Sequence, residues 1–285
     1  MPILLIFLCT VTLTVQQVFK KQYSLRCAGG NYFFSASVSF FALLFFLLIP
    51  GKISLGTDIL PYSAGFAAMF ALATVFSVMA LTIGSLAITS LVLSYSLIIP
   101  TLYGILFLNE KITLLKCGGI LLLLISLFLV RAQTKEDNKA SKPTVKWIIY
   151  VLIAFVANGM CSVVQNAQQR KFDGTQNSNF MILALIISTA VLLVLSLAFE
   201  RHTILNALKK GTVLSAACGI CNGATNYLVM VIIAAVASSV FFPVLSAGQL
   251  ILTFIISVFA YREKFIPRQI AGLACGLASL VILNI

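Results

Sequence analysis

The stretch NFMILALIISTAVLLVLSLA, residues 179–198, decides the fold because its twenty consecutive residues include no charged side chain. A helix of about twenty apolar residues spans the roughly 30 Å hydrocarbon layer of a bilayer. The stretch does not alternate apolar and polar residues, as a strand of a membrane barrel would. Lipid offers no partner to backbone N–H and C=O groups, so such a segment must pair them internally, as a helix does.

The rest of the chain repeats this pattern. Of its 285 residues, 61% are apolar and only 9% are charged, and the mean hydropathy is +1.10. A soluble domain cannot bury so large an apolar fraction. The sequence therefore predicts an all-α membrane protein with ten transmembrane helices, at about residues 2–19, 32–48, 61–81, 86–108, 113–130, 147–164, 179–198, 213–231, 234–260 and 269–285.

A polar stretch, RAQTKEDNKASKPTVK at residues 131–146, divides the predicted helices into two groups of five. It is the longest hydrophilic stretch in the chain, which is typical of a linker. We therefore expect a first repeat at residues 1–130, the linker at 131–146 and a second repeat at 147–285.

The two halves share short motifs in the same order. Each half has an odd number of predicted spans, so the second half should enter the membrane in the opposite direction, as an inverted repeat. Such halves can rock about a site at the middle of the membrane and expose it to either side. The matching motifs, which lie about 150 residues apart, are Lys20-Lys21 and Arg170-Lys171, Asn31-Tyr32 and Asn179-Phe180, Ala73-Thr74 and Ala224-Thr225, and Glu110-Lys111 and Glu263-Lys264.

The net charge of +12 comes from basic residues scattered among the predicted connections. This scatter favours a role in membrane orientation over binding to nucleic acid. Fourteen basic residues fall on the side of the central linker and five on the other side. The excess predicts a cytoplasmic linker with both termini outside, in the cell membrane of a bacterium. The seven cysteines show no disulfide framework and no metal-ligand spacing.

The end of each half carries a similar pattern: a proline-bearing helix, a glutamate at a turn and a final helix with glycine. In this respect the chain resembles the EamA family of the drug/metabolite transporter superfamily over nearly its whole length. The resemblance implies ten helices in two five-helix repeats, a cavity between them and transport of small metabolites or drugs. The residues that carry it are Pro100, Asn109-Glu110-Lys111 and Gly119, and then Pro243, Arg262-Glu263-Lys264 and Gly272.

All seven acidic residues, and the single histidine His202, fall in predicted loops or at helix ends. The sequence therefore predicts no buried proton relay, no metal, no cofactor and no enzymatic activity. A neutral or zwitterionic substrate would be recognised by uncharged polar and aromatic side chains within the spans. The candidates are Gln16, Ser94, Tyr95, Asn158, Gln165, Asn222, Asn226, Tyr227 and Gln249, and the alternative is that these residues only bond neighbouring helices.

Two further features concern helix ends and helix contacts. Glu110 with Lys111, and Glu263 with Lys264, open predicted helices, where they could cap the helix or form a gate. The pairs Gly219-x3-Gly223 and Gly272-x3-Gly276 permit close helix contact, which we expect within one chain more than in a homodimer.

These features together predict a secondary transporter, either a monomer or a homodimer, that moves a small organic molecule across the bilayer by alternating access. The alternative is a membrane receptor or scaffold that transports nothing.

Overall fold

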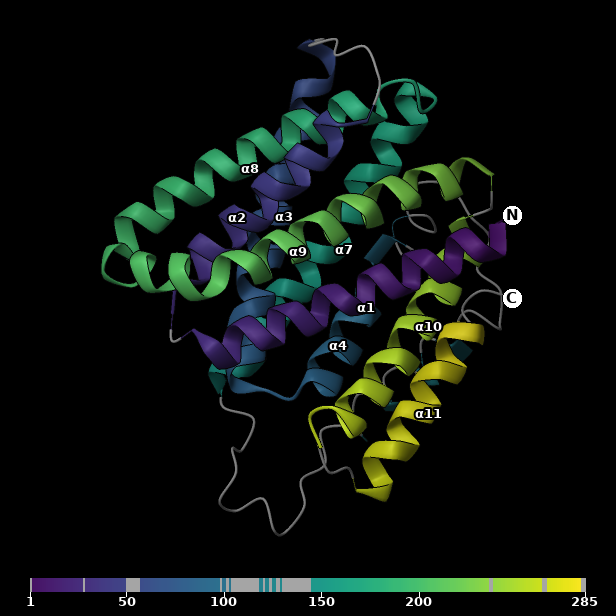
Figure 1. Ribbon diagram of the computed structural model, residues 1–285. Coiled ribbons are helices and arrows are strands. Elements are labelled where there is room, and N and C mark those ends of the chain that lie inside the picture. Colours follow the sequence, from purple (N-terminus) through teal and green to yellow (C-terminus); the bar gives the residue numbers. More distant parts are fainter. Residues whose placement is uncertain are drawn as a thin grey trace.

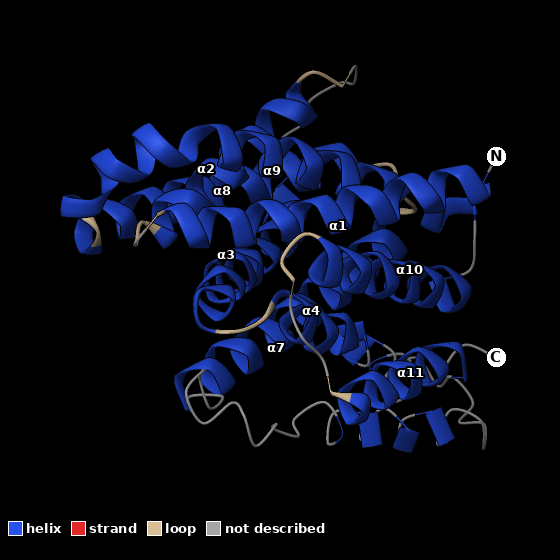
Figure 2. Cartoon of the chain, turned by 60° about the horizontal axis from the view of Figure 1, so that its bottom comes forward, coloured by secondary structure: helices blue, strands red, loops and turns tan. Residues whose placement is uncertain are grey.

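The computed structural model describes residues 2–27, 29–49, 57–97, 145–235, 238–262 and 266–282, with short pieces at 99–100, 103, 118–119, 121–122, 125–126 and 129. Within these ranges every regular element is helical, as predicted (Figures 1 and 2). Most of the predicted linker and the residues Glu110, Lys111, Glu263 and Lys264 lie outside the described residues.

The described helices match nine of the predicted spans. The fourth predicted span is helical as far as Ser94 and continues as a 3-10 turn over Tyr95–Leu97, and most of the fifth lies outside the described residues. The helices are α1 (Pro2–Arg26), α2 (Asn31–Leu47), α3 (Leu60–Ile83), α4 (Leu86–Ser94), α7 (Val145–Phe172), α8 (Asn177–Phe199), α9 (Arg201–Ala235), α10 (Ser238–Phe259) and α11 (Pro267–Ile282).

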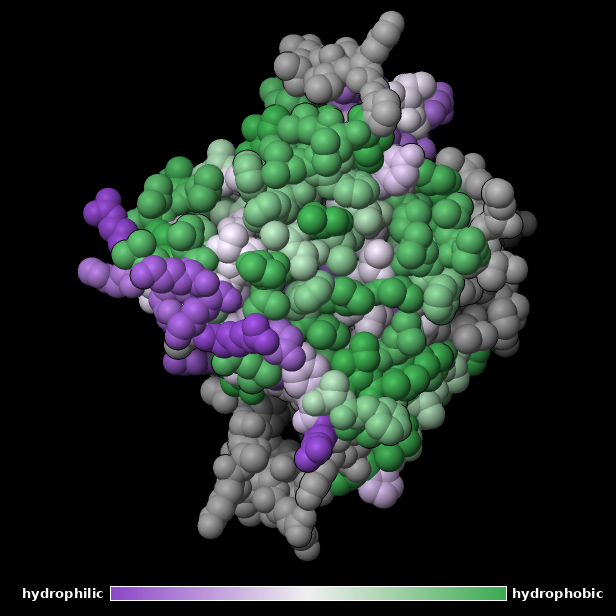
Figure 3. Space-filling model, viewed as in Figure 1, coloured by the Kyte–Doolittle hydropathy of each residue, from purple (hydrophilic) through white to green (hydrophobic). Residues whose placement is uncertain are grey.

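Five of these helices, α1, α3, α7, α8 and α9, are long and apolar enough to cross a membrane. Large apolar side chains on their outer faces are exposed, as at Val194 (65%) and Val213 (80%). Figure 3 shows such side chains over most of one face, with hydrophilic residues gathered toward the left and the upper right edges. Exposed apolar surface on this scale is what lipid contact requires. The chain fits an integral membrane protein.

Several helices are longer than predicted. The sequence placed Lys20, Lys21, Arg170 and Lys171 in connections, but α1 continues to Arg26 and α7 to Phe172. Lysine and arginine are good helix formers, so nothing in the backbone ends these helices at the first charge. The Lys21 ammonium donates to the carbonyls of Leu81 (3.0 Å) and Gly84 (2.8 Å), at the C-terminal end of α3. A cation at this end of a helix meets unpaired carbonyl groups.

Two pairs of helices pack antiparallel in matching ways. Along α1, Cys9 lies against the Thr225 carbonyl of α9, whereas Tyr23 lies against Gly211, much earlier in α9. Along α3, the Tyr62 ring contacts Phe172 near the end of α7, whereas Phe76 contacts Tyr150 near its start. Each of these pairs joins a helix of the first half to a helix of the second half.

Helices α2 and α8 also run antiparallel. Tyr32 pairs with Phe199 at 6.2 Å between ring centroids, and the Ser39 and Ser188 hydroxyls lie 3.2 Å apart near the middle of the two helices. The remaining principal contacts also occur in pairs: α2 with α9 and α8 with α3, then α1 with α10 and α7 with α4. Exchanging the two halves therefore reproduces most of the packing.

Glycines allow α9 to approach α2 within the same chain. A Cβ atom on Gly219 would lie 2.6 Å from the Val38 carbonyl oxygen, and one on Gly223 would lie 2.8 Å from the Phe45 side chain. A Cβ atom on Gly276 in α11 would lie even closer to the Tyr95 hydroxyl. Gly219, Gly223 and Gly276 thus make close contacts inside the chain, and a homodimer stays an alternative prediction.

The N-terminus of α2 is capped by Glu200, from the junction of α8 and α9. Its carboxylate accepts hydrogen bonds from the backbone N–H groups of Asn31 (2.7 Å), Tyr32 (3.0 Å) and Phe33 (3.2 Å). The residue before α2, Gly30, has a left-handed φ of 75° and no side chain to form a cap. Burial raises the pKa of Glu200, while the N–H donors act in the opposite direction. The capped helix end ties the two halves together.

Candidate functional site

A central cavity of about 160 Å³ lies between helices of both halves. For comparison, a cavity of about 150 Å³ in another protein accepts benzene. Its wall comes from α1, α3, α4, α7, α9 and α10, so no single half encloses it. The polar side chains that line it are Gln16, Gln17, Lys20, Thr74, Ser77, Ser94, Ser96, Asn158, Ser162, Gln165, Asn222, Thr225, Asn226, Ser246 and Gln249.

Seven of the nine residues proposed from the sequence line this cavity: Gln16, Ser94, Asn158, Gln165, Asn222, Asn226 and Gln249. Helical spacing explains why they come together. Residues three, four or seven positions apart share one face of a helix, as Asn158 and Gln165 do on α7 and Asn222 and Asn226 do on α9. Whether they bind a substrate remains a prediction.

A network of amides and hydroxyls joins α1 to α9 at the cavity wall. The Gln16 side-chain nitrogen donates to the Thr225 hydroxyl (2.7 Å), and the Asn222 amide donates to the Gln16 oxygen (3.0 Å). Thr225 in turn donates to Thr12 at 2.8 Å. These amides therefore bond neighbouring helices and line the cavity at the same time, and their recognition of a substrate stays a prediction.

Helix α7 contributes a second group of amides. Asn158 donates to the Ser96 hydroxyl at 2.7 Å, and Gln165 donates to the Asn226 oxygen at 3.3 Å. Gly159 permits the first contact, because a Cβ atom there would lie 2.7 Å from the Ser96 carbonyl oxygen. The cavity can thus offer donors and acceptors from two directions.

Tyr95 and Tyr227 lie away from the cavity, in contrast to the prediction. The Tyr95 hydroxyl is buried against the Ser126 hydroxyl, and its ring belongs to an apolar cluster with Leu91. Tyr227 is 38% exposed on the outside of the bundle, where its ring meets Phe45 at 6.5 Å between centroids. Each follows a cavity residue directly in sequence, and one position turns a helical side chain by about 100°.

The sequence reasoning missed Lys20, the one charged side chain among the described residues of the cavity wall. Lys20 is 8% exposed, and its ammonium donates to the Ser77 hydroxyl at 3.2 Å. The signal was present in the sequence, because Lys20 lies four residues after Gln16 and therefore on the same helix face. Because the predicted first span stopped at Phe19, Lys20 was assigned to a connection.

The described residues hold no group of three or more His, Cys, Asp or Glu side chains that could bind a metal ion. The lining supplies hydrogen-bonding groups, two phenylalanine rings at Phe66 and Phe70, and a single ammonium. This chemistry suits reversible binding of a small polar molecule.

The helices around the cavity pack more closely at one end than at the other. At the end where α1 and α3 finish, Lys20 and Lys21 bond α3, and Ser24 reaches the Leu81 carbonyl at 3.4 Å. At the opposite end the corresponding helices, α7 and α9, approach each other less closely, and a hydrogen bond from Gln165 to Asn226 joins them. The cavity wall is therefore asymmetric although the two halves are arranged alike.

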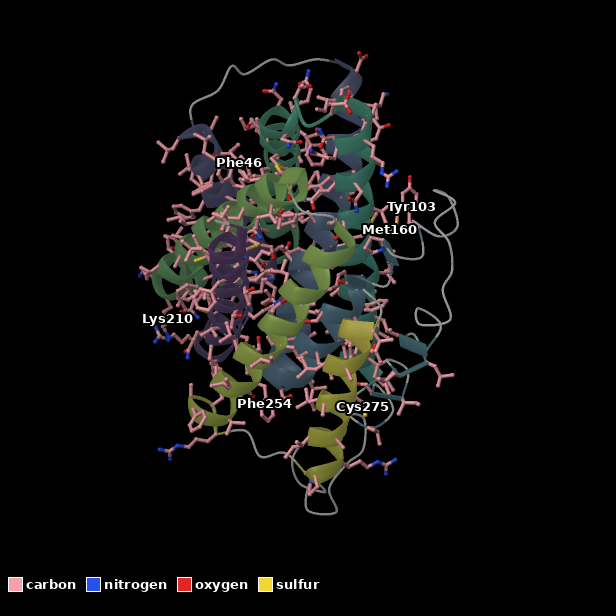
Figure 4. All side chains as sticks on the ribbon, turned by 90° about the vertical axis from the view of Figure 1, so that its right-hand side faces the viewer. Phe46, Tyr103, Met160, Lys210, Phe254 and Cys275 are labelled. Atoms are coloured by element: carbon pink, nitrogen blue, oxygen red, sulfur yellow. The ribbon has the colours of Figure 1, made fainter. Side chains whose placement is uncertain are left out.

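The end of the molecule where α1 and α3 finish also carries more basic side chains, and we refer to it as the basic end. Figure 4 shows Lys210 there, with its side chain pointing outward from the edge of the molecule. The exposed basic residues of this end include Arg26, Lys146, Arg201, Lys209 and Lys210, whereas Arg170 and Lys171 lie at the opposite end. The division among described residues follows the charge bias predicted from the sequence.

Comparison with known proteins supports the fold but names no function. No family model matches the chain, and no curated protein matches it. A solved structure described only as a crystal structure of a protein aligns with a TM-score of 0.67, over 98% of this chain and 94% of that chain. The two sequences are 13% identical, so the likeness concerns the fold alone. The arrangement of almost the whole chain thus occurs in a solved protein.

Proposed function

We propose that this protein is a secondary transporter that carries a small polar organic molecule through the central cavity by alternating access. The observation that carries the proposal is that the two halves pack alike but differ at the two ends of the cavity. The helix pair α1 and α3 packs closely at the basic end, while its counterpart α7 and α9 packs less closely at the opposite end, where Gln165 bonds Asn226. Exchanging these two arrangements would expose the cavity to the other side of the membrane.

The direction of the helices supports an inverted repeat. Helices α2 and α8 are the second helices of their halves, and they run antiparallel with Ser39 beside Ser188. The separation of these serines, 149 residues, agrees with the spacing of the repeated sequence motifs. Two equivalent helices that cross in opposite directions fit an axis lying in the membrane plane.

The charge distribution supports an orientation in the cell membrane. Positive side chains concentrate on the cytoplasmic side of membrane proteins. The basic end, with Arg26, Arg201, Lys209 and Lys210, would then face the cytoplasm. Since the helices pack more closely at this end, the structure would correspond to an outward-facing state, with both termini outside. Members of the EamA family, which the chain resembles, are often drawn with cytoplasmic termini, so this orientation rests on the charge distribution alone.

Flux through proteoliposomes tests the proposal. The purified chain is reconstituted and screened by counterflow with labelled small metabolites, and saturable exchange of at least one compound is expected. The variant Asn226→Leu should slow exchange about tenfold, because its amide bonds Asn222 and Gln165 in the cavity wall. The matched control Tyr227→Leu changes the next residue, which faces outward, and should leave exchange within about twofold. Equal loss in both variants, or no saturable exchange at all, would contradict the proposal.

A further inference from the structure

The cavity wall carries a lysine, Lys20, that no carboxylate of the described residues neutralises. Lys20 lies on the cavity face of α1, and only 8% of the residue is exposed. The Ser77 hydroxyl accepts one of its hydrogen bonds at 3.2 Å, and Ser77 uses its own proton to bond the Thr74 carbonyl. An ammonium group has three donors, so this contact leaves it with unused capacity.

No described carboxylate pairs with Lys20. Asp58 lies in the 3-10 turn before α3, Asp173 follows α7, and Glu200 caps α2. All three are therefore at helix ends, away from the cavity wall. An unpaired charge inside a membrane protein is costly, and such residues usually face a partner, a ligand or a water-filled path. An ion pair among the described residues therefore does not explain why Lys20 is buried.

The neighbours of Lys20 are suited to the rest of a small molecule. Gln17 is 6% exposed, lines the same cavity, and its side-chain oxygen has no hydrogen-bond partner in the described structure. Gln16, four residues before Lys20, belongs to the amide network on the same wall. A bound molecule with an anionic group at one end would accept hydrogen bonds from the Lys20 ammonium, and its neutral N–H or O–H groups would donate to the Gln16 and Gln17 oxygens.

We infer that Lys20 binds a carboxylate of the transported molecule, so that the substrate class is a small carboxylate-bearing solute, either a zwitterion or a monoanion. This inference rests on the proposed transport function and narrows it, because a neutral solute would leave the ammonium uncompensated. The cavity volume of about 160 Å³ limits the part of the solute that it encloses to about the size of a six-membered ring.

Matched ligand pairs test the inference on the purified full-length chain in detergent. Each carboxylate is compared with its own amide, for example benzoate with benzamide and leucine with leucinamide, by thermal unfolding and by titration calorimetry. The wild type should bind at least one carboxylate more tightly than the paired amide, and Lys20→Met should weaken that carboxylate about tenfold or more. Lys20→Arg should retain part of the affinity because it keeps the charge.

The control Lys210→Met removes the same charge from an exposed lysine at the basic end that does not line the cavity. Carboxylate affinity in this variant should stay within about threefold of wild type. The preference of the wild type for acid over amide needs no variant, so it decides the question even if Lys20→Met fails to fold.

Three results would overturn the inference in distinguishable ways. Amides that bind and exchange as well as their acids would refute the carboxylate class while leaving the transport function intact. Carboxylate binding that is the same in wild type and Lys20→Met would refute the role of Lys20. The absence of any binding or exchange with either class would overturn the inference and the proposed function together.

Discussion

Replacing Glu200 by alanine should destabilise the fold by about 2 kcal/mol. The change removes the acceptor of three backbone N–H groups, those of Asn31, Tyr32 and Phe33, at distances of 2.7 to 3.2 Å. Hydrogen bonds to a charged group contribute about 1.5–3 kcal/mol each, but the half-buried site lets water replace part of them. Loss of an N-cap alone costs about 0.5–2 kcal/mol, which sets the lower limit.

Unfolding in a graded mixture of dodecyl maltoside and sodium dodecyl sulfate would measure this loss. Trp147 is the single tryptophan of the chain and donates a hydrogen bond to Thr89, so its fluorescence reports on the packing of α7 against α4. Glu200→Gln is the matched control because it keeps an acceptor oxygen without the charge. It should lose less than about 1 kcal/mol at neutral pH.

The pH dependence has a defined sign. Because burial raises the pKa of Glu200 above its ordinary value of 4.5, the part of the stability that comes from this pKa difference is fully present below pH 4.5 and is lost as the pH rises through the raised pKa, while the hydrogen bonds from the N–H groups of α2 remain. The stability of wild type relative to Glu200→Gln should therefore fall as the pH increases from 4.5. An alanine variant as stable as wild type, or a glutamine variant as unstable as alanine, would refute the capping role.

Three further variants follow from the packing. Gly219→Ala should lower the free energy of unfolding by about 1–3 kcal/mol in the same detergent titration, because its Cβ would lie 2.6 Å from the Val38 carbonyl oxygen. The control Gly65→Ala, whose Cβ would meet nothing within 4 Å, should be neutral or stabilising. Equal effects of the two changes would contradict the close contact at Gly219. Gln16→Leu should lower the free energy of unfolding by about 1–3 kcal/mol, because it removes the hydrogen bonds of Gln16 with Asn222 and Thr225. Gln16→Glu keeps the oxygen that accepts from Asn222 and should lose less. Tyr95→Phe should lower stability by about 1 kcal/mol through the hydrogen bond to Ser126 but leave exchange rates in proteoliposomes unchanged, so a selective loss of flux would place Tyr95 in the site after all.

Apolar runs in the sequence were sufficient to predict the described helices, but not their polar extensions, such as the first turns of α9, which begins at Arg201. The sequence was also sufficient to find Gln16, Asn158 and Asn222, since amides in such runs turn toward protein. Helix rotation was harder to predict: Tyr227 follows Asn226 directly but points outward, and only packing against Phe45 decides which side faces lipid. Helix ends were harder still, because a lysine looks like the end of a span unless its neighbours shield it, as α3 shields Lys20.

The burial of Lys20 in only one half bears on how such a molecule could have arisen. Its counterpart by the repeat spacing is Arg170, which is exposed. If the halves descend from one duplicated gene, each of two identical ancestral subunits would have carried the same cation at this position. Joining the copies in one polypeptide allows each to mutate separately, so that a single ammonium can remain inside while its former twin moves to the surface.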